Sequence, residues 1–153
     1  MSLANLAKIG RLKPHTPTLR ETQRLLAAVA HNLKDSRVAS ISDEGRFDAA
    51  YKAIMQCAMI ALMASGYRPS ANVPGHHQTM IQSLELALRV PKDDRIVLDA
   101  LRRKRNLNDY TGDPIDTTSV RECITRAEIL NRLTRSWLSI HHAEVVEPNE
   151  WTS

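Results

Sequence analysis

Residues 43–66 read DEGRFDAAYKAIMQCAMIALMASG, and this stretch decides the fold class. Its apolar side chains recur at helical spacing and form one stripe: Phe47, Tyr51, Ile54, Ala58 and Leu62. Ser42 and the two carboxylates after it mark a helix start, and Gly66 can end the helix in a left-handed conformation. From 53 to 64 the helix is apolar nearly all round, so it belongs at the centre of a bundle or in a dimer interface.

Four further helices are predicted around this segment. The first starts near Thr18, where Thr18 and Glu21 form a capping-box pattern, and it ends near Arg37. The others begin near His76, Lys92 and Thr117, and prolines and glycines separate them. In the helix that begins at Lys92, we expect four side chains to face the core: Ile96, Val97, Ala100 and Leu101.

The sequence therefore predicts an all-α protein, an antiparallel up-and-down bundle of about five helices, because short connections favour antiparallel neighbours. We expect this bundle to span residues 18–142. Residues 1–17 are expected to form an N-terminal arm that lies on the bundle or frays, and residues 143–153 a flexible acidic tail. A chain of 153 residues suits one domain with a substantial core.

The composition is that of an ordinary globular protein, with 42% apolar and 25% charged residues. The formal net charge of +4 permits a polyanionic partner without establishing one. Cys57 and Cys123 lie inside apolar helical patterns, which indicates buried free thiols in a reducing compartment. The apolar stretch 53–64 is too short to span a bilayer and no signal peptide is visible, so we expect a cytoplasmic protein without a membrane partner.

The most informative polar segment is RRKRNLNDY, at residues 102–110. On a helix, Arg102, Asn106 and Tyr110 are spaced four apart and share one side, while Arg105 and Asp109 occupy the neighbouring strip. Arginine suits phosphate recognition because its planar fork makes bidentate hydrogen bonds. The alternative interpretation is a solvated helix end, where basic side chains are favourable through the helix dipole alone.

A second candidate is the Gly75-His76-His77 sequence that opens the third helix. Adjacent histidines on a helix point about 100° apart, so they make a poor metal pair, although one of them could line a cleft. Four common motifs are absent from the sequence: GxxxxGK[ST], GxGxxG, HExxH and GxSxG. We therefore expect neither a metal nor a cofactor.

Three features resemble the HEPN superfamily, small helical bundles common in prokaryotic toxin–antitoxin and defence systems. They are Arg46-Phe47 followed by Ala50-Tyr51, then Gly75-His76, and then Arg105-Asn106 shortly before an aromatic residue. The resemblance covers about residues 19–138. It implies a homodimer in which two signature segments face each other across a shared cleft.

The HEPN signature is an arginine, a polar residue after it, and a histidine a few positions later. Arg105 and Asn106 match the first two, and Tyr110 stands where the histidine is expected. The resemblance implies metal-independent RNA cleavage, in which the arginine holds the scissile phosphate and the histidine moves the proton of the 2′-hydroxyl. A phenol is a poor base at neutral pH, but it can donate a hydrogen bond or act as an acid.

The candidate catalytic residues are therefore Arg105, Asn106 and Tyr110. The candidate residues for binding RNA or phosphate are Arg102, Arg103, Asp109, His76 and His77. Of these, His76 or His77 can supply the missing base if the third helix flanks the cleft.

Three functions remain open from the sequence. One is an RNA-associated protein of toxin–antitoxin or defence type, with metal-independent endoribonuclease activity at an altered site. Another is a non-catalytic dimeric module that binds RNA, a nucleotide or a partner protein through the same cleft. The third is a purely protein-binding role, for example with a nucleotidyltransferase-like partner.

Overall fold

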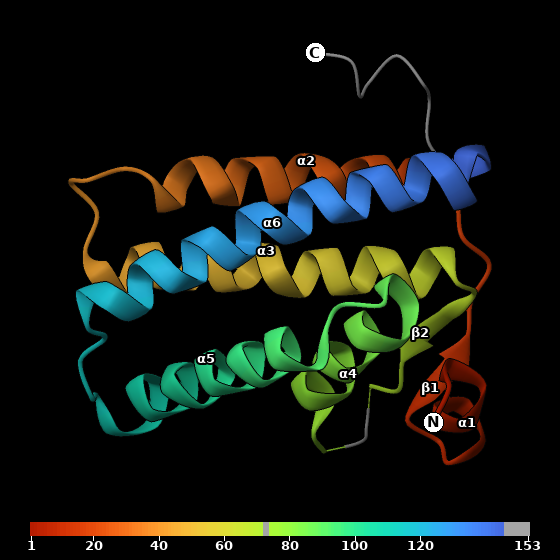
Figure 1. The fold of residues 1–153 in the computed structure, drawn as a ribbon, viewed down its shortest axis with the longest axis horizontal. Coiled ribbons are helices and arrows are strands. Elements are labelled where there is room, and N and C mark those ends of the chain that lie inside the picture. The colour runs from red at the N-terminus through yellow and green to blue at the C-terminus, as the bar shows by residue number, and fades with distance from the viewer. Residues whose placement is uncertain (72–73, 146–153) are drawn as a thin grey trace.

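The computed structural model describes residues 1–71 and 74–145, which form an all-α bundle (Figure 1). The α-helices are α1 (Leu3–Lys8), α2 (Leu19–Ser36), α3 (Asp43–Ala64), α4 (His76–Leu88), α5 (Lys92–Thr111) and α6 (Thr117–His141). The short elements are β1 (Leu12–Pro14), β2 (Tyr67–Pro69) and the 3-10 helix η1 (Ala143–Val145). All five predicted helices are present, and α1 is an addition to them.

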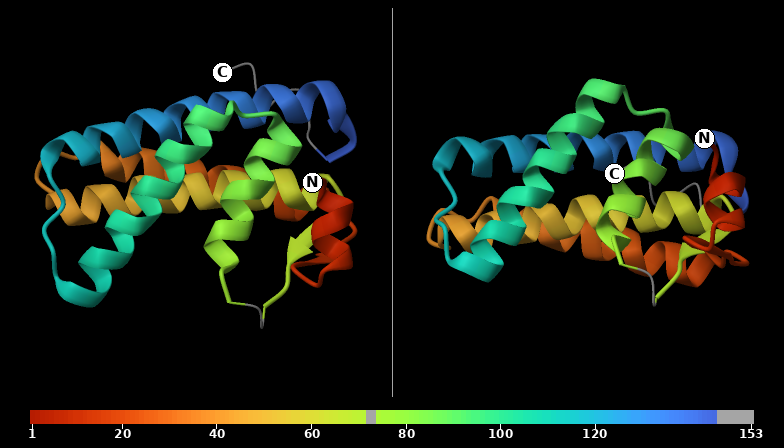
Figure 2. Two further views of the ribbon diagram at one scale, coloured as in Figure 1. Left: turned by 60° about the horizontal axis from the view of Figure 1, so that its bottom comes forward. Right: turned by 90° about the horizontal axis from the view of Figure 1, so that it is seen from below.

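Helices α2, α3 and α6 form the body of the bundle, and α5 lies below them in Figure 1. Consecutive long helices run antiparallel, α2 with α3 and α5 with α6, as the up-and-down prediction requires. Helices α3 and α6 run in the same direction, because α4 and α5 intervene between them. Helices α4 and α5 are joined by a short turn and point away from it in different directions (Figure 2).

Helix α3 is the core helix. It packs against α2, α4 and α6, and side chains all round it are buried, Phe47, Ile54 and Leu62 among them. By length and composition this helix could also cross a membrane, but most of it is buried inside the bundle, as in the core helix of a globular domain. The sequence therefore located the centre of the bundle correctly.

The caps that were expected at two helix starts are confirmed. Thr18 Oγ1 accepts a hydrogen bond from the Glu21 backbone N–H at 3.2 Å, and the Glu21 carboxylate accepts one from the Thr18 backbone N–H at 3.3 Å. This capping box satisfies two backbone N–H groups at the start of α2. At the start of α3, Ser42 Oγ accepts from the Gly45 backbone N–H at 3.1 Å.

The N-terminal arm lies on the bundle. Its strand β1 pairs antiparallel with β2, with Leu12 opposite Pro69, and Leu6 and Leu12 are buried. At the other end of the chain, the first part of the expected flexible tail is η1, whose Val145 is buried. Residues 146–153 of that tail lie outside the described residues.

The predicted core face of α5 was wrong in part. Ile96 is 54% exposed and Ala100 is also exposed, whereas Leu98 and Leu101 are the buried side chains of this helix. Only a narrow stripe of α5 is buried, because Leu98 and Leu101 lie three apart on one side of the helix. Ile96 and Ala100 lie outside that stripe and are exposed.

Candidate functional site

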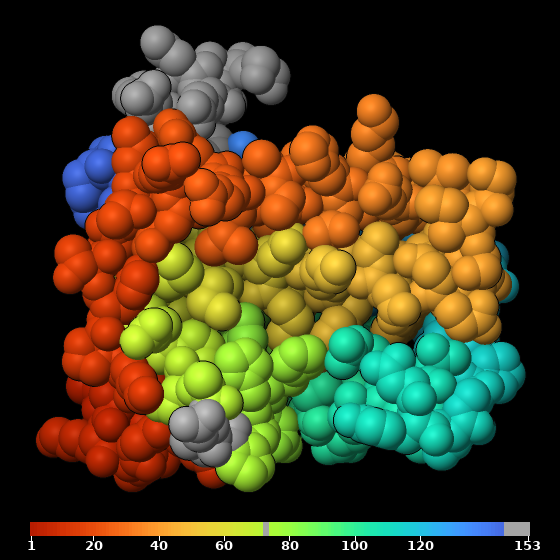
Figure 3. Space-filling model, turned by 180° about the vertical axis from the view of Figure 1, so that it is seen from behind, coloured from red at the N-terminus to blue at the C-terminus, as the bar shows by residue number. Residues whose placement is uncertain are grey.

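A cavity of about 380 Å³ lies where α3, α4 and α5 meet. Figure 3 shows the face on which α3 in yellow, α4 in green and α5 in teal adjoin. The cavity is lined by Asp48, Tyr51, Lys52, Met55, His77 and Arg105. Four of these residues come from α3 at helical spacing, so they share one face of the core helix, and α4 and α5 contribute one residue each.

Tyr51 connects the core to this cavity. Its ring stacks on Phe47 with ring centroids 6.4 Å apart, and the residue is only 2% exposed. Its hydroxyl oxygen lies 2.9 Å from Nδ1 of His77, a hydrogen-bonding distance. Burial raises the pKa of Tyr51 to about 12, although Arg105 acts in the opposite direction, so the phenol keeps its proton at neutral pH.

Arg105 also lies over the ring of Tyr51. Its guanidinium carbon lies 5.1 Å from the centre of the Tyr51 ring, which is a cation–π distance. One guanidinium nitrogen lies 3.7 Å from the carboxylate of Asp109, one helical turn further along α5. Because five N–H donors share one planar group, these contacts leave Arg105 able to donate to a ligand in the cavity.

Two titrating groups in the cavity have shifted pKa values. Burial, reinforced by the nearby Arg105 charge, lowers the pKa of His77 below its ordinary value, so the imidazole is neutral at neutral pH. Burial and the negative charge of Asp109 raise the pKa of Asp48, against the opposing effect of Arg105. The cavity thus combines a guanidinium, an ammonium, a neutral imidazole and a carboxyl group that protonates more easily than usual.

Arg102 and Arg103 share a single carboxylate. Both donate to Asp99, Arg102 at 2.9 Å and Arg103 at 2.8 Å. Arg102 is largely covered, and its charge helps to lower the pKa of His77 and opposes the rise in the pKa of Tyr51, whereas Arg103 is mostly exposed. Neither lines the cavity, so Arg102 acts on the site through its charge alone.

The structure separates Tyr110 from Arg105. Tyr110 is 85% exposed and does not line the cavity, and neither does Asn106. The reason is the helical register of α5, because the side shared by 102, 106 and 110 is not the strip from which Arg105 faces α3. His77 is the histidine that reaches the cavity, and His76 lies beside it with ring centroids 5.8 Å apart.

Sequence reasoning missed Asp48, Lys52 and Met55 as site residues and treated Tyr51 as part of the core stripe. A signal was present, since Asp48 and Lys52 are polar residues four apart on an otherwise apolar helix. Such a pair on the core helix indicates a face that the neighbouring helices leave open.

Other reactive groups lie outside the cavity. Burial raises the pKa of the Cys57 and Cys123 thiols to about 12 each, so both are poor nucleophiles. Within residues 1–71 and 74–145, no three His, Cys, Asp or Glu side chains form a group that could hold a metal ion. Comparison of the chain with protein-family models, curated proteins and solved structures found no match in any of the three.

Proposed function

We propose that this chain is a HEPN-type, RNA-associated protein that holds a backbone phosphate in the cavity between α3, α4 and α5. The observation that carries this proposal is the meeting of Arg105 and His77 in one cavity, bridged by the buried Tyr51. The arginine of the HEPN-like segment thereby gains a histidine partner from α4, in place of one further along its own helix. A guanidinium fork beside further N–H donors fits the oxygens of a phosphate.

Proton positions favour binding at this site. The Tyr51 hydroxyl keeps its proton, and its described partner is His77 Nδ1, so we infer that the hydroxyl donates to Nδ1. A neutral imidazole that accepts at Nδ1 carries its own proton on Nε2. In this tautomer Nε2–H of His77 is an uncharged donor for a phosphate oxygen, beside the charged donors Arg105 and Lys52.

Metal-independent RNA cleavage is the second candidate function, and a specific observation favours it. A neutral histidine and a carboxyl group of raised pKa, His77 and Asp48, lie in the same cavity as Arg105. Such a pair can remove the proton of a 2′-hydroxyl and return one to the leaving oxygen. For His77 to act as the base, Nδ1–H would have to donate to the Tyr51 oxygen, so the tautomer of His77 separates the two candidates.

A homodimer is the proposed assembly. Helix α5, which carries Arg105, also exposes Ile96, Leu107 and Tyr110, which are 54%, 50% and 85% exposed. Apolar side chains along one solvent-facing helix are typical of a helix that packs on a partner. A second copy on α5 would bring two Arg105 cavities close to one RNA strand.

The test incubates purified protein with mixed labelled RNA in EDTA, and follows both binding and cleavage. The variants are Arg105→Ala and His77→Gln, with Arg24→Ala on the exposed face of α2 as a control of equal charge. Binding without cleavage that is weakened by Arg105→Ala and not by Arg24→Ala supports the phosphate site. Cleavage that disappears with both cavity variants supports the endoribonuclease, and wild-type protein that neither binds nor cleaves RNA contradicts both.

A further inference from the structure

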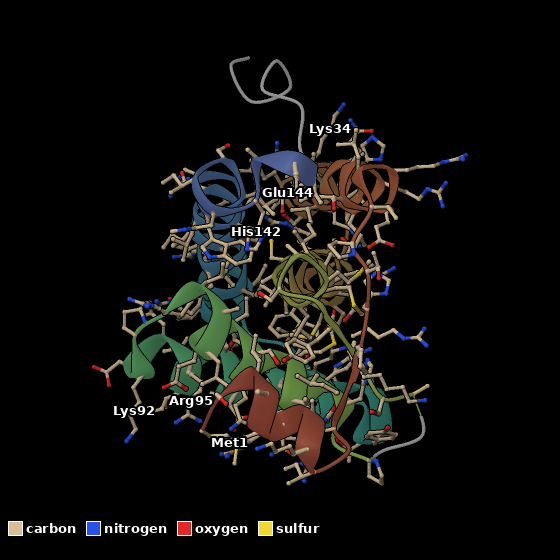
Figure 4. All side chains as sticks on the ribbon, turned by 90° about the vertical axis from the view of Figure 1, so that its right-hand side faces the viewer. Met1, Lys34, Lys92, Arg95, His142 and Glu144 are labelled. Carbon is tan, nitrogen blue, oxygen red and sulfur yellow. The ribbon has the colours of Figure 1, made fainter. Side chains whose placement is uncertain are left out.

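A second groove, of about 600 Å³, lies at the opposite end of α4 from His77, between the turn after α4 and the last turns of α6. Its lining includes Arg89, Leu133, Trp137, Ile140, His141 and His142. Figure 4 looks onto this end of the bundle and labels His142, the residue that follows α6. None of these residues lines the Arg105 cavity, so the groove is a separate feature of the molecule.

Arg89 holds an unusual backbone conformation at the rim of this groove. It caps α4 with φ 58° and ψ 37°, the left-handed region that glycine normally occupies at a helix end. Among the described residues it is the only non-glycine with positive φ. Within that same part of the chain Arg89 has no ion-pair partner, and its side chain lines the groove although its backbone is strained.

Aromatic rings form one wall of the groove. The Trp137 ring lies 4.5 Å from the His142 ring and 6.4 Å from the His141 ring, measured between centroids. Leu133 and Ile140 add an apolar surface beside them, and Ile140 is 73% exposed. The His142 and His141 rings are tilted by 51° and 48° to the Trp137 ring. An aromatic ring with a cation beside it can take a nucleobase on the ring and the attached phosphate on the cation.

We propose that this groove is a second binding site for single-stranded RNA, with a base against Trp137 and a phosphate on Arg89. This inference rests on the proposed association with RNA and adds a contact remote from the Arg105 cavity. The volume of the groove lies in the range that holds a nucleotide-sized ligand. A carboxylate-rich peptide would satisfy Arg89 but offers no base to lie against Trp137, and for that reason we commit to RNA.

The Arg89→Gly variant separates binding from folding. Glycine adopts the left-handed conformation without strain, so the variant should unfold at a temperature about 2–4 °C higher than the wild type. It also removes the guanidinium, so the affinity for single-stranded RNA should fall. The slope of log affinity against log salt concentration should decrease by about 0.7, the value for one phosphate contact. Arg89→Lys keeps the charge and should bind nearly as the wild type does.

Trp137 emission reports the groove directly. The chain has two tryptophans, so Trp137 is the sole one in a Trp151→Phe background. The probe is a short 2′-O-methyl RNA oligonucleotide, which cannot be cleaved through its 2′ oxygen. We expect this oligonucleotide to quench the emission of Trp137 in both the wild-type and the Arg105→Ala protein. In the Arg89→Gly protein the quenching should be weak.

Three results would overturn the second site. The first is Trp137 emission that does not change at saturating RNA, and the second is quenching by polyglutamate as strong as that by RNA. The third is quenching by RNA that appears only when residues 146–153 are deleted, because the chain's own end would then be the occupant of the groove. Anisotropy of a labelled oligonucleotide keeps the two proposals apart. If RNA binding depends on Arg105 but does not quench Trp137, the groove is ruled out as an RNA site and the cavity is supported. If Arg105→Ala changes neither the quenching nor the affinity, the cavity is ruled out and the groove is supported.

Discussion

Tyr51 serves two parts of the structure at once, because its ring stacks on Phe47 in the core and its hydroxyl reaches His77 at the cavity. The side chain is buried, and its neighbours on α3 and α5 hold the ring in place. The hydroxyl therefore fixes the orientation of a histidine that comes from a different helix. Tyr51 is a positioning residue in this account, and it acts on the ligand through His77.

Replacing Tyr51 by phenylalanine tests that role. The variant keeps the ring, the stacking and the cation–π contact, and it removes only the proton donated to His77 Nδ1. We expect a single Nε2–H tautomer in the wild type and a mixture of tautomers in Tyr51→Phe, with RNA affinity about 5-fold lower for the loss of one hydrogen bond. Nitrogen chemical shifts of the His77 ring measure the tautomer, and a wild-type ring protonated at Nδ1 would favour cleavage over binding.

Asp48→Asn should strengthen both folding and RNA binding at neutral pH. A carboxyl whose pKa is raised on folding stabilises the native state below its unfolded pKa, and that stability is lost as the pH rises through the folded pKa. Asparagine carries no charge at any of these pH values, so the variant does not lose this stability and should melt at a higher temperature than the wild type at pH 7. The difference in melting temperature should vanish in acid, below the unfolded pKa near ~3.9. The variant also removes a negative charge from the phosphate site.

The same variant discriminates the two candidate functions. If Asp48 takes part in cleavage, Asp48→Asn abolishes turnover of RNA in EDTA. Thermal melts at neutral and acid pH, with RNA affinity measured beside them, cover both questions. Lower affinity in Asp48→Asn at neutral pH would contradict the phosphate assignment.

At the level of single elements, local signals predicted the helices well. The capping box at Thr18 and Glu21, the Ser42 cap and the stripe from Phe47 to Leu62 are short-range patterns, and the structure has a helix at each. The pairing of β1 with β2 was out of reach, because three-residue strands more than 50 positions apart carry no local signal. For α5, the sequence placed Leu101 in the core correctly, but it also placed Ile96 and Ala100 there, and the packing buries Leu98 in their stead.

The cavity was predictable in part for the same reason. Arg105 stood out by its chemistry, and His77 was a candidate on the condition that its helix flanks the cleft. In the structure His77 lines the same cavity as Arg105. Helix register then decided against Tyr110, since a spacing of five from Arg105 turns that side chain to the surface. Which face of α3 would stay open depends on how α4 and α5 cross it, a property of the tertiary structure.

Gly75 sets where α4 begins and therefore where His77 lies. It is the N-cap of α4 with φ +82°, and it provides no side-chain cap. An alanine there would be strained by about 1–2 kcal/mol, so Gly75→Ala should lower the melting temperature and weaken RNA binding. Gly75→Asn is the matched control. Because asparagine tolerates the left-handed region, this variant should keep most of the melting temperature and most of the RNA affinity of the wild type. Equal losses in the two variants would mean that the conformation of Gly75 is not what positions His77.

For the whole molecule, the proposed homodimer gives a prediction about mass. Light scattering during gel filtration should find a particle of twice the 17.2 kDa chain mass. Leu107→Glu places a charge on the exposed face of α5 and should yield the single chain, whereas Ile9→Glu, at a similarly exposed site on the N-terminal arm, should leave the dimer intact. A wild-type monomer, or a dimer that survives Leu107→Glu, would rule out α5 as the contact.

The salt dependence of RNA affinity in EDTA tests most directly whether Arg105 holds an RNA phosphate. Arg105→Ala should bind roughly 10- to 100-fold more weakly than the wild type, as for the loss of a charged hydrogen-bond donor. Its slope of log affinity against log salt should be smaller by about 0.7, while Arg24→Ala should leave that slope nearly unchanged. Equal affinities and slopes for Arg105→Ala and Arg24→Ala would contradict the account.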